Sequence, residues 1–262
     1  MKVSCLILAA GVGSRLGHIT KENPKCMVKL FGKSLIEHQI ETLVSCNVKR
    51  IGIATGYLKE KFKKLGFPTY YNPDFASTNM VESLFKSVDF FNSLETDLLI
   101  SYGDIVFQKK NLIKLLDCNA DFTVMIDKKW LDLWSVRNEN PLIDAETLRL
   151  DKRGDIVQLG KKPKNLGEIE GQYTGLFLIR KNKISKLIDF YKKMNPDILY
   201  DGRKFKQMFM TSFLQSLIDH GWKIRATQVC NGWLEVDTIT DIKNYENLFK
   251  KGLLKKLWNQ NE

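Results

Sequence analysis

Long apolar runs, paired cysteines and clustered histidines are all missing from this chain. No run is long enough to cross a bilayer, and the sequence after Met1 does not follow the pattern of a signal peptide. The five cysteines are odd in number and none is spaced as CxxC, which argues against a disulfide framework. These absences predict a cytoplasmic protein with free thiols.

Histidine is equally scarce, with three residues in 262. His38 and His220 fall in expected helices, and we interpret them as structural or solvated. His18 lies in a loop, where an imidazole could contact a phosphate. Nothing in the sequence groups these side chains as a metal site or a catalytic base.

The remaining composition indicates a globular protein rather than a disordered one. Hydrophobic residues make up 44% of the chain, charged residues 27%, and there are only six prolines. The net charge of +11 invites a nucleic-acid interpretation. Most lysines, however, are spread along amphipathic segments such as 57–67, and only 248–258 forms a local cluster of basic residues. A basic solvated surface and a small anionic substrate are therefore favoured, with neither nucleic acid nor membrane as partner.

The first half of the chain alternates apolar runs with amphipathic segments, which predicts an α/β fold with a mostly parallel sheet and right-handed crossovers. The apolar runs expected as strands are 3–10, 50–56, 97–104 and 121–127. The amphipathic segments expected as helices are 34–44 and 78–91, the second with Thr78 or Asn79 as its N-cap. Ligands bind at the carboxyl ends of such strands. The residues expected at these ends are Gly11–Lys25, Gly103–Asp104 and Asp127.

The second half changes character. Residues 146–163 indicate a hairpin, 171–180 a strand, 207–221 an amphipathic helix, and 232–249 a strand followed by a turn and a helix. No linker separates the halves, so we expect one domain over 1–262 with a small β-rich part.

The stretch LAAGVGSRLGHITKENPKCMVKLFGK (8–33) follows the first expected strand and suits a phosphate-binding loop. Gly11 and Gly13 allow phosphates to approach the backbone N–H groups. Arg15 can hold phosphate oxygens in a bidentate way, and Pro24 stiffens the chain beside Lys25. The loop has no GK[ST] at the spacing that a P-loop requires, and it lacks the third glycine of a dinucleotide fingerprint, where Arg15 and Leu16 stand instead.

Four segments together resemble nucleotidyltransferases that couple a nucleoside triphosphate to a small phosphorylated acceptor. They are the loop just quoted, TNMVESL at 78–84, GD at 103–104 and WLEVDT at 233–238. TNMVESL and WLEVDT most resemble the phosphocholine cytidylyltransferase branch, including relatives that act on phosphoglutamine for capsule phosphoramidate. The resemblance implies a Rossmann-like fold, Mg²⁺, release of pyrophosphate, and possible homodimers. It also implies that 1–127 mainly binds nucleotide and that 128–262 mainly binds acceptor and supplies a second metal ligand.

By the same resemblance, Arg15 holds the β- and γ-phosphates and Lys25 stabilises charge at the α-phosphate. The remaining nucleotide-binding residues that it implies are Leu8, Ala9, Ala10, Gly11, Gly13, Ser14, Thr78, Asn79 and Gly103.

Asp104 and Asp237 each end an apolar strand, where a carboxylate suits Mg²⁺. Either could instead be an ordinary strand-end turn or helix cap. Glu235 lies two residues before Asp237 on the same strand face and is a ligand or co-ligand candidate. Which of the two is the main second ligand stays open.

The acceptor-binding candidates are aromatic and charged. Trp130 and Trp134 lie one helical turn apart, and could form either core packing or an aromatic wall that attracts an ammonium group. Tyr173 and Trp233 are further aromatic candidates. Arg137 could pair with the acceptor phosphate, and Asp144 or Glu146 with its amine.

Three functions follow from these residues and their resemblance. The first is cytidylyl transfer from CTP to phosphocholine, phosphoglutamine or a similar acceptor. The second is a sugar-1-phosphate nucleotidyltransferase, and the third is a catalytically silent regulatory module of the same fold. The retained Arg15, Lys25, Asp104 and Asp237 argue against the third.

Overall fold

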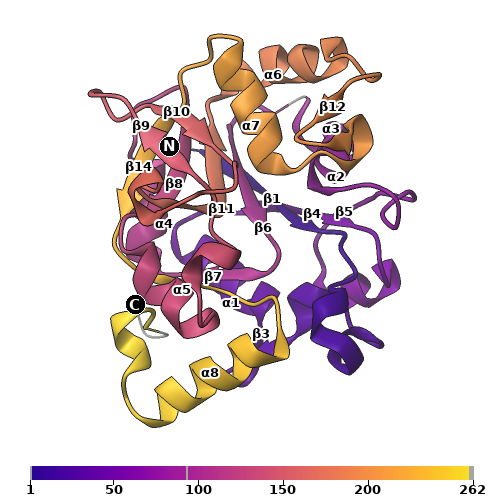
Figure 1. Cartoon of the computed structure of the whole chain (residues 1–262). Helices are drawn as coiled ribbons and strands as arrows, with labels where there is room; N and C mark the ends of the chain where they lie inside the picture. Colours follow the sequence, from indigo (N-terminus) through magenta and orange to yellow (C-terminus); the bar gives the residue numbers. More distant parts are fainter. Residues whose placement is uncertain (1, 93, 260–262) are drawn as a thin grey trace.

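The computed structural model describes residues 2–92 and 94–259 and has a central seven-stranded sheet with helices on both faces (Figure 1). The strand order is β14-β8-β11-β6-β1-β4-β5. Only β11 runs antiparallel to its neighbours, β6 and β8. The seven strands are β1 (Val3–Ala9), β4 (Arg50–Thr55), β5 (Thr69–Tyr71), β6 (Asp97–Tyr102), β8 (Phe122–Asp127), β11 (Gln172–Ile179) and β14 (Arg225–Val229).

Alternate residues of each strand pack against helices on opposite faces, as the pleat requires. In β1, Cys5 and Ile7 belong to one apolar core, and Leu6 and Leu8 belong to the other. The first core includes helices α1 (Leu35–Ser45), α4 (Lys109–Leu116), α5 (Trp130–Arg137) and α8 (Ile239–Lys250). The second includes α2 (Met80–Lys86), α3 (Val88–Phe91), α6 (Lys181–Lys193) and α7 (Met210–Asp219).

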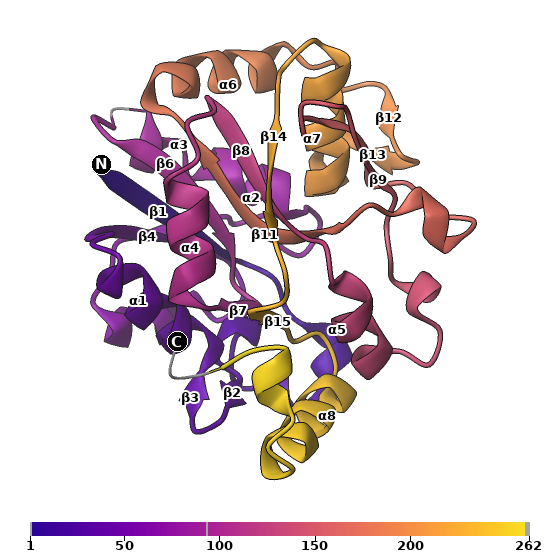
Figure 2. The same cartoon turned by 90° about the vertical axis from the view of Figure 1, so that its left-hand side faces the viewer.

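Four short antiparallel pairs complete the fold. They are β2 (Lys29–Leu30) with β3 (Lys33–Ser34), β7 (Ile105–Phe107) with β15 (Trp233–Glu235), β9 (Leu148–Leu150) with β10 (Ile156–Leu159), and β12 (Leu199–Tyr200) with β13 (Arg203–Lys204). Figure 2 shows β9, β12 and β13 in the same direction as α7, and Figure 1 shows that α7 separates β9 from β12. The expected fold class, a mostly parallel sheet flanked by helices with a small β-rich part, is confirmed.

The expected helix over 78–91 is divided. Asn79, and not Thr78, caps α2 by accepting a hydrogen bond from the N–H of Met80 at 2.8 Å. Ser87 leaves the helical conformation, and its hydroxyl donates to the carbonyl of Ser83 at 2.9 Å. Serine competes with the backbone for hydrogen bonds in this way, which ends α2 and starts α3.

Among the described residues, no helix combines the length and the hydrophobicity that crossing a bilayer would require.

Candidate active site

The first part of the site is the loop after β1. Gly13 has φ +69°, and a Cβ there would lie 2.8 Å from the Cβ of Lys25. The absence of a side chain at Gly13 therefore lets the stem of Lys25 pack directly on the loop backbone. Gly13 thus helps to set the direction of the lysine, which adds to the phosphate-cradling role expected from the sequence.

The second part is the turn after β6. The N–H of Gly103 donates to the carbonyl of Leu8 at 2.9 Å, and a Cβ on Gly103 would lie 2.8 Å from that same oxygen. Only glycine allows the chain to approach β1 so closely. Asp104 follows directly, so its carboxylate lies beside the loop that carries Lys25.

The third part is contributed by the end of the chain. Strand β15 pairs with β7, which places Glu235 opposite Ile105. The N–H of Val236 then donates to the carbonyl of Asp104 at 3.0 Å. This short sheet brings Glu235 and Asp237 to Asp104 from about 130 residues away in the sequence.

Asp104, Glu235 and Asp237 form an acidic cluster whose carboxylate oxygens can lie within 4.8 Å of one another. Lys25 Nζ donates to Asp104 Oδ2 at 2.5 Å and also to Asp237 Oδ1. Arg15 reaches the same Asp237 oxygen at 2.9 Å from a largely exposed position. Within the described residues, Asp104 Oδ1 is buried without a hydrogen-bond partner. The three carboxylates, together with the unpartnered Oδ1 of Asp104, provide the oxygen ligands that a hard cation such as Mg²⁺ prefers.

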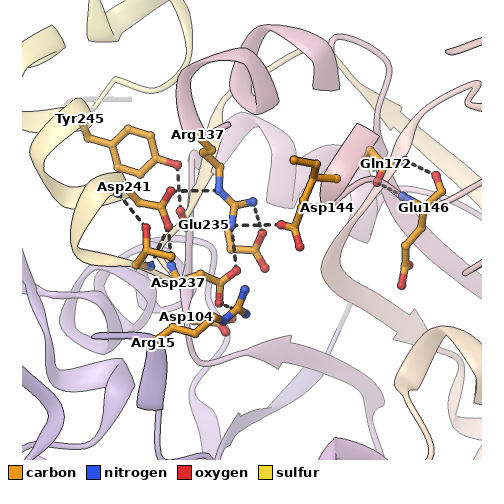
Figure 3. A network of polar contacts seen from close by, with 12 residues as sticks. Arg15, Asp104, Arg137, Asp144, Glu146, Gln172, Glu235, Asp237, Asp241 and Tyr245 are labelled. Carbon is orange, nitrogen blue, oxygen red and sulfur yellow. Dashed lines mark hydrogen bonds and ion pairs between the residues drawn. The ribbon is translucent and has the colours of Figure 1, made fainter. Parts of the chain in front are cut away.

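A buried arginine supports the cluster from behind (Figure 3). The side chain of Arg137 is 3% exposed and contacts Glu235 at 2.5 Å and Asp237 Oδ2 at 2.7 Å. Its Nε lies 3.4 Å from Asp241 Oδ1. Asp241 in turn accepts hydrogen bonds from the N–H groups of Asp237 and Thr238, both at 2.8 Å.

These charges shift the pKa values of the cluster. Burial opposes ionisation of Asp237, but Lys25 and Arg137 outweigh it and lower the pKa of this carboxyl. Burial also disfavours the charged form of Lys25, yet Asp104 and Asp237 raise the pKa of the ammonium. Burial raises the pKa of Glu235 to about 8, against the lowering effect of Arg137. Lys25 and Asp237 are therefore charged at neutral pH.

Two cavities meet at the acidic cluster. The larger has a volume of about 380 Å³ and is lined by the loop after β1, by Lys25, and by the cluster itself. All the expected nucleotide-binding residues line it: Leu8, Ala9, Ala10, Gly11, Gly13, Ser14, Thr78, Asn79 and Gly103. The second cavity, of about 180 Å³, shares Arg15, Glu235 and Asp237 with the first. Two molecules bound there would meet beside the cluster.

The second cavity contains some of the expected acceptor-binding residues. Trp134, Asp144, Glu146 and Tyr173 line it. Thr211 donates to Glu146 at 3.3 Å, which favours the ionised form. Burial has the larger effect and raises the pKa of Glu146 to about 7. In Figure 3, Glu146 lies beside Gln172, on the opposite side of Asp144 from Arg137.

Three acceptor candidates do not line either cavity. Trp130 is buried in the core, with its ring centroid 6.0 Å from that of Trp134. Trp233 is also buried, and its indole N–H donates to Asp127 at 2.9 Å. Arg137 is engaged by carboxylates, as described above. The expected aromatic wall is therefore reduced to Trp134 and Tyr173, because the other rings stabilise the core.

The structure adds residues that the sequence analysis did not single out. Tyr102 and Phe209 line both cavities, and the Tyr102 and Tyr173 rings meet edge to face with centroids 5.5 Å apart. Burial raises the pKa of both phenols, so both are neutral. Tyr102 directly precedes the GD pair at 103–104, and that position was the available signal.

Comparison with known proteins agrees with this geometry. A family model described as the MobA-like NTP transferase domain matches residues 5–129. The CTP:phosphoglutamine cytidylyltransferase of Campylobacter jejuni subsp. jejuni serotype O:2 is 40% identical over 249 residues, which are 92% of this chain and 98% of the relative. The chain belongs to the nucleotidyltransferase family. It is an enzyme that transfers a nucleotidyl group.

One further relative and two solved structures have lower sequence identity to this chain. The choline-phosphate cytidylyltransferase of Haemophilus influenzae is 29% identical over 153 residues, which are 57% of this chain and 62% of the relative. Two solved structures share the fold at 19–20% identity. The inositol-1-phosphate CTP transferase of T. maritima has a TM-score of 0.72, covering 98% of this chain and 96% of its own. The CTP:phosphocholine cytidylyltransferase of Streptococcus pneumoniae has a TM-score of 0.69, covering 95% and 100%.

Proposed function

We propose that this nucleotidyltransferase is a Mg²⁺-dependent cytidylyltransferase. It moves CMP from CTP to a small, amine-bearing phosphorylated acceptor and releases pyrophosphate. The observation that carries the proposal is the meeting of two cavities at Glu235 and Asp237, beside Lys25 and Asp104, which line the larger cavity. The choice of CTP rests on the named activity of the relatives, because nothing in the loop itself selects a base.

The larger cavity is the proposed nucleotide site. The N–H groups between Ala10 and Ser14 provide donors for phosphates, and Arg15 adds a guanidinium at the cavity wall. Arg15 is 60% exposed, so it can turn toward a bound triphosphate without leaving a buried space behind.

Asp104, Asp237 and Glu235 are the residues that would hold Mg²⁺. When bound, the ion would neutralise phosphate charge and favour attack at the α-phosphate. Arg137 fixes the orientation of Glu235 and Asp237, and is therefore a positioning residue and not an acceptor-binding one.

Lys25 is the proposed catalytic residue for charge at the α-phosphate. An acceptor phosphate is already anionic near neutral pH, since its second pKa is about 6. The reaction then needs positioning and charge stabilisation and no general base. This agrees with the absence of histidine from the residues that line either cavity.

The second cavity is the proposed acceptor site. Beyond the residues that it shares with the nucleotide site, its charged side chains are Asp144 and Glu146. Two carboxyl groups beside the rings of Trp134, Tyr102 and Tyr173 favour an acceptor with a positively charged amine. Phosphoglutamine is the first candidate because the relative named for it covers nearly the whole chain. Phosphocholine is the second.

Pyrophosphate release from CTP and phosphoglutamine, with and without Mg²⁺, tests the proposal. Asp104→Asn should abolish Mg²⁺-dependent release while its circular dichroism spectrum stays that of the wild type. Asp189→Asn, on the exposed side of α6, is the matched control and should retain activity. Near-normal activity of a folded Asp104→Asn protein would remove Asp104 from the metal site.

A further inference from the structure

The ammonium group of Lys25 lies where a bridging metal ion would contact the acidic cluster. It is shared between Asp104 Oδ2 and Asp237 Oδ1, which come from two different strands' ends. The same two residues belong to the group of carboxylates that can contact one metal ion. A divalent cation and this ammonium would therefore compete for the same oxygens.

The other buried cation at the cluster has a different position. Arg137 contacts the far oxygen of Asp237, Oδ2, and reaches Glu235 and Asp241 as well. Its side chain is 3% exposed, so it has no route to solvent. Arg137 can therefore remain in place when a metal ion binds on the open side.

Lys25 faces that open side and lines the larger cavity. Its four-carbon stem is flexible, and its charge is a point that three N–H groups can direct differently. A bound triphosphate would offer the ammonium new anionic partners in the same cavity.

We propose that Lys25 is an internal substitute for the metal ion. It occupies the bridging position between Asp104 and Asp237 until metal and nucleotide arrive, and then moves to the nucleotide phosphates. This inference rests on the proposed function. Its consequence is that the acidic cluster binds metal weakly in the absence of nucleotide, because the ion must displace an ammonium already held by two carboxylates. Binding of the metal ion therefore strengthens binding of the nucleotide, and binding of the nucleotide strengthens binding of the metal ion.

Mn²⁺ binding to the nucleotide-free protein tests this, with free Mn²⁺ measured by electron paramagnetic resonance. An opposite charge at this distance shifts proton affinity by roughly 1–3 pKa units, so removing it should tighten Mn²⁺ binding about tenfold or more in Lys25→Met and Lys25→Gln. Lys25→Arg keeps the charge and should bind Mn²⁺ no more tightly than the wild type. Lys21→Met, at an exposed position of the same loop, should also match the wild type. Unchanged or weaker Mn²⁺ binding in both neutral variants would overturn the proposal.

A second test uses the wild-type protein alone, so its outcome does not depend on whether a variant folds. Acetic anhydride labels free amines, and mass spectrometry can follow Lys25 with Lys21 as an internal reference. Saturating Mn²⁺ should accelerate labelling of Lys25 and leave Lys21 unchanged, since displacement from the carboxylates frees the amine. Equal labelling with and without Mn²⁺ would contradict the displacement. Absence of pyrophosphate release from CTP by the wild type would instead reject the proposed function. The Mn²⁺-binding and labelling results do not depend on that activity.

Discussion

At the scale of single residues, Lys25 has two sets of anionic partners, the carboxylates of the acidic cluster and the phosphates of a bound nucleotide. In the structure it is paired with Asp104 and Asp237, and its stem packs against the backbone of Gly13. In the proposed reaction it serves the α-phosphate. A lysine that exchanges carboxylates for phosphate contributes little to ground-state binding, because it gives up one set of ion pairs to form another. Its contribution then lies in the transition state.

Lys25→Ala should therefore lower kcat far more than it weakens CTP binding. By comparison with the loss of one oxyanion donor, the expected cost is about 3–4 kcal/mol in the barrier. Steady-state kinetics with CTP varied at saturating Mg²⁺ measures both quantities. An unchanged kcat with a raised KM would make Lys25 an ordinary binding residue.

Glu146 is a second residue whose environment makes a prediction. Burial raises its pKa to about 7, so the folded state favours the protonated carboxyl more than the unfolded chain does. Its contribution to stability is therefore full below the ordinary pKa of 4.5 and is lost as the pH rises through about 7. A cationic acceptor has the opposite preference, because it binds the ionised form.

The KM for phosphoglutamine or phosphocholine should accordingly rise as the pH falls below about 7. Glu146→Gln should remove the part of this pH dependence at about pH 7, leaving the titration of the acceptor phosphate at about pH 6, and should also stabilise the unliganded protein above pH 7. Both effects depend on ionisation of one buried carboxyl group. Measurement of the acceptor KM across about pH 5.5–8.5 tests the first, and urea unfolding at each pH tests the second. An identical KM profile in wild type and Glu146→Gln would exclude this residue from acceptor binding.

At the scale of elements, the start of α8 connects protein stability with the position of Asp237. Thr238 caps this helix by accepting from the N–H of Asp241, and the Asp241 carboxylate accepts from the N–H groups of Asp237 and Thr238. Asp241 also contacts Arg137. The cap residue thus affects the helix alone, whereas Asp241 affects both the helix and the acidic cluster.

Thr238→Ala and Asp241→Ala should separate these roles. Loss of the threonine cap should lower the free energy of unfolding by about 1 kcal/mol with kcat near the wild-type value. Loss of Asp241 leaves a buried arginine and a buried N–H less satisfied, so it should cost about 1–3 kcal/mol and also lower kcat. Urea unfolding and pyrophosphate release measure the two effects. Equal loss of kcat in both variants would show that α8 does not position the site through Asp241.

The long strands and helices could be predicted because their signal is local. The apolar runs at 3–10, 50–56 and 121–127 correspond to β1, β4 and β8 within one or two residues. Short or mostly polar elements gave no comparable signal. Strand β7 has three residues, and β14 (RATQV) has few apolar ones. Their pairing with distant strands, and not their own sequence, makes them strands.

At the scale of the whole molecule, the same distinction applies to the site. The loop residues that are adjacent in sequence line one cavity, since a strand followed by a glycine-rich loop specifies its own geometry. The ion pairs of Arg137 could not be predicted because its partners, Glu235 and Asp237, lie about 100 residues away and meet it through packing of α5 on α8. Trp130 and Trp233 are buried in the core, and the sequence could not distinguish this from ligand binding because a buried aromatic ring has the same sequence signature as a ligand-binding one.

Both halves of the chain contribute to two cavities that adjoin at Arg15, Glu235 and Asp237. The first half of the chain supplies the loop after β1, Lys25 and Asp104, and the second half supplies Glu235 and Asp237. Residues of both halves line the proposed acceptor cavity. The two halves meet through β7 and β15. A nucleotide and a phosphorylated acceptor would therefore react at the boundary between the halves.

Pyrophosphate release across a matrix of nucleotides and acceptors tests this account most directly. The nucleotides are CTP, UTP, GTP and ATP, and the acceptors are phosphoglutamine, phosphocholine, aminoethylphosphonate and glucose-1-phosphate, each with and without Mg²⁺. We predict Mg²⁺-dependent release with CTP and an amine-bearing acceptor, with phosphoglutamine giving the highest kcat/KM. Turnover confined to glucose-1-phosphate would contradict the account and identify a nucleotide-sugar enzyme. No turnover with any pair would indicate a silent member of the family.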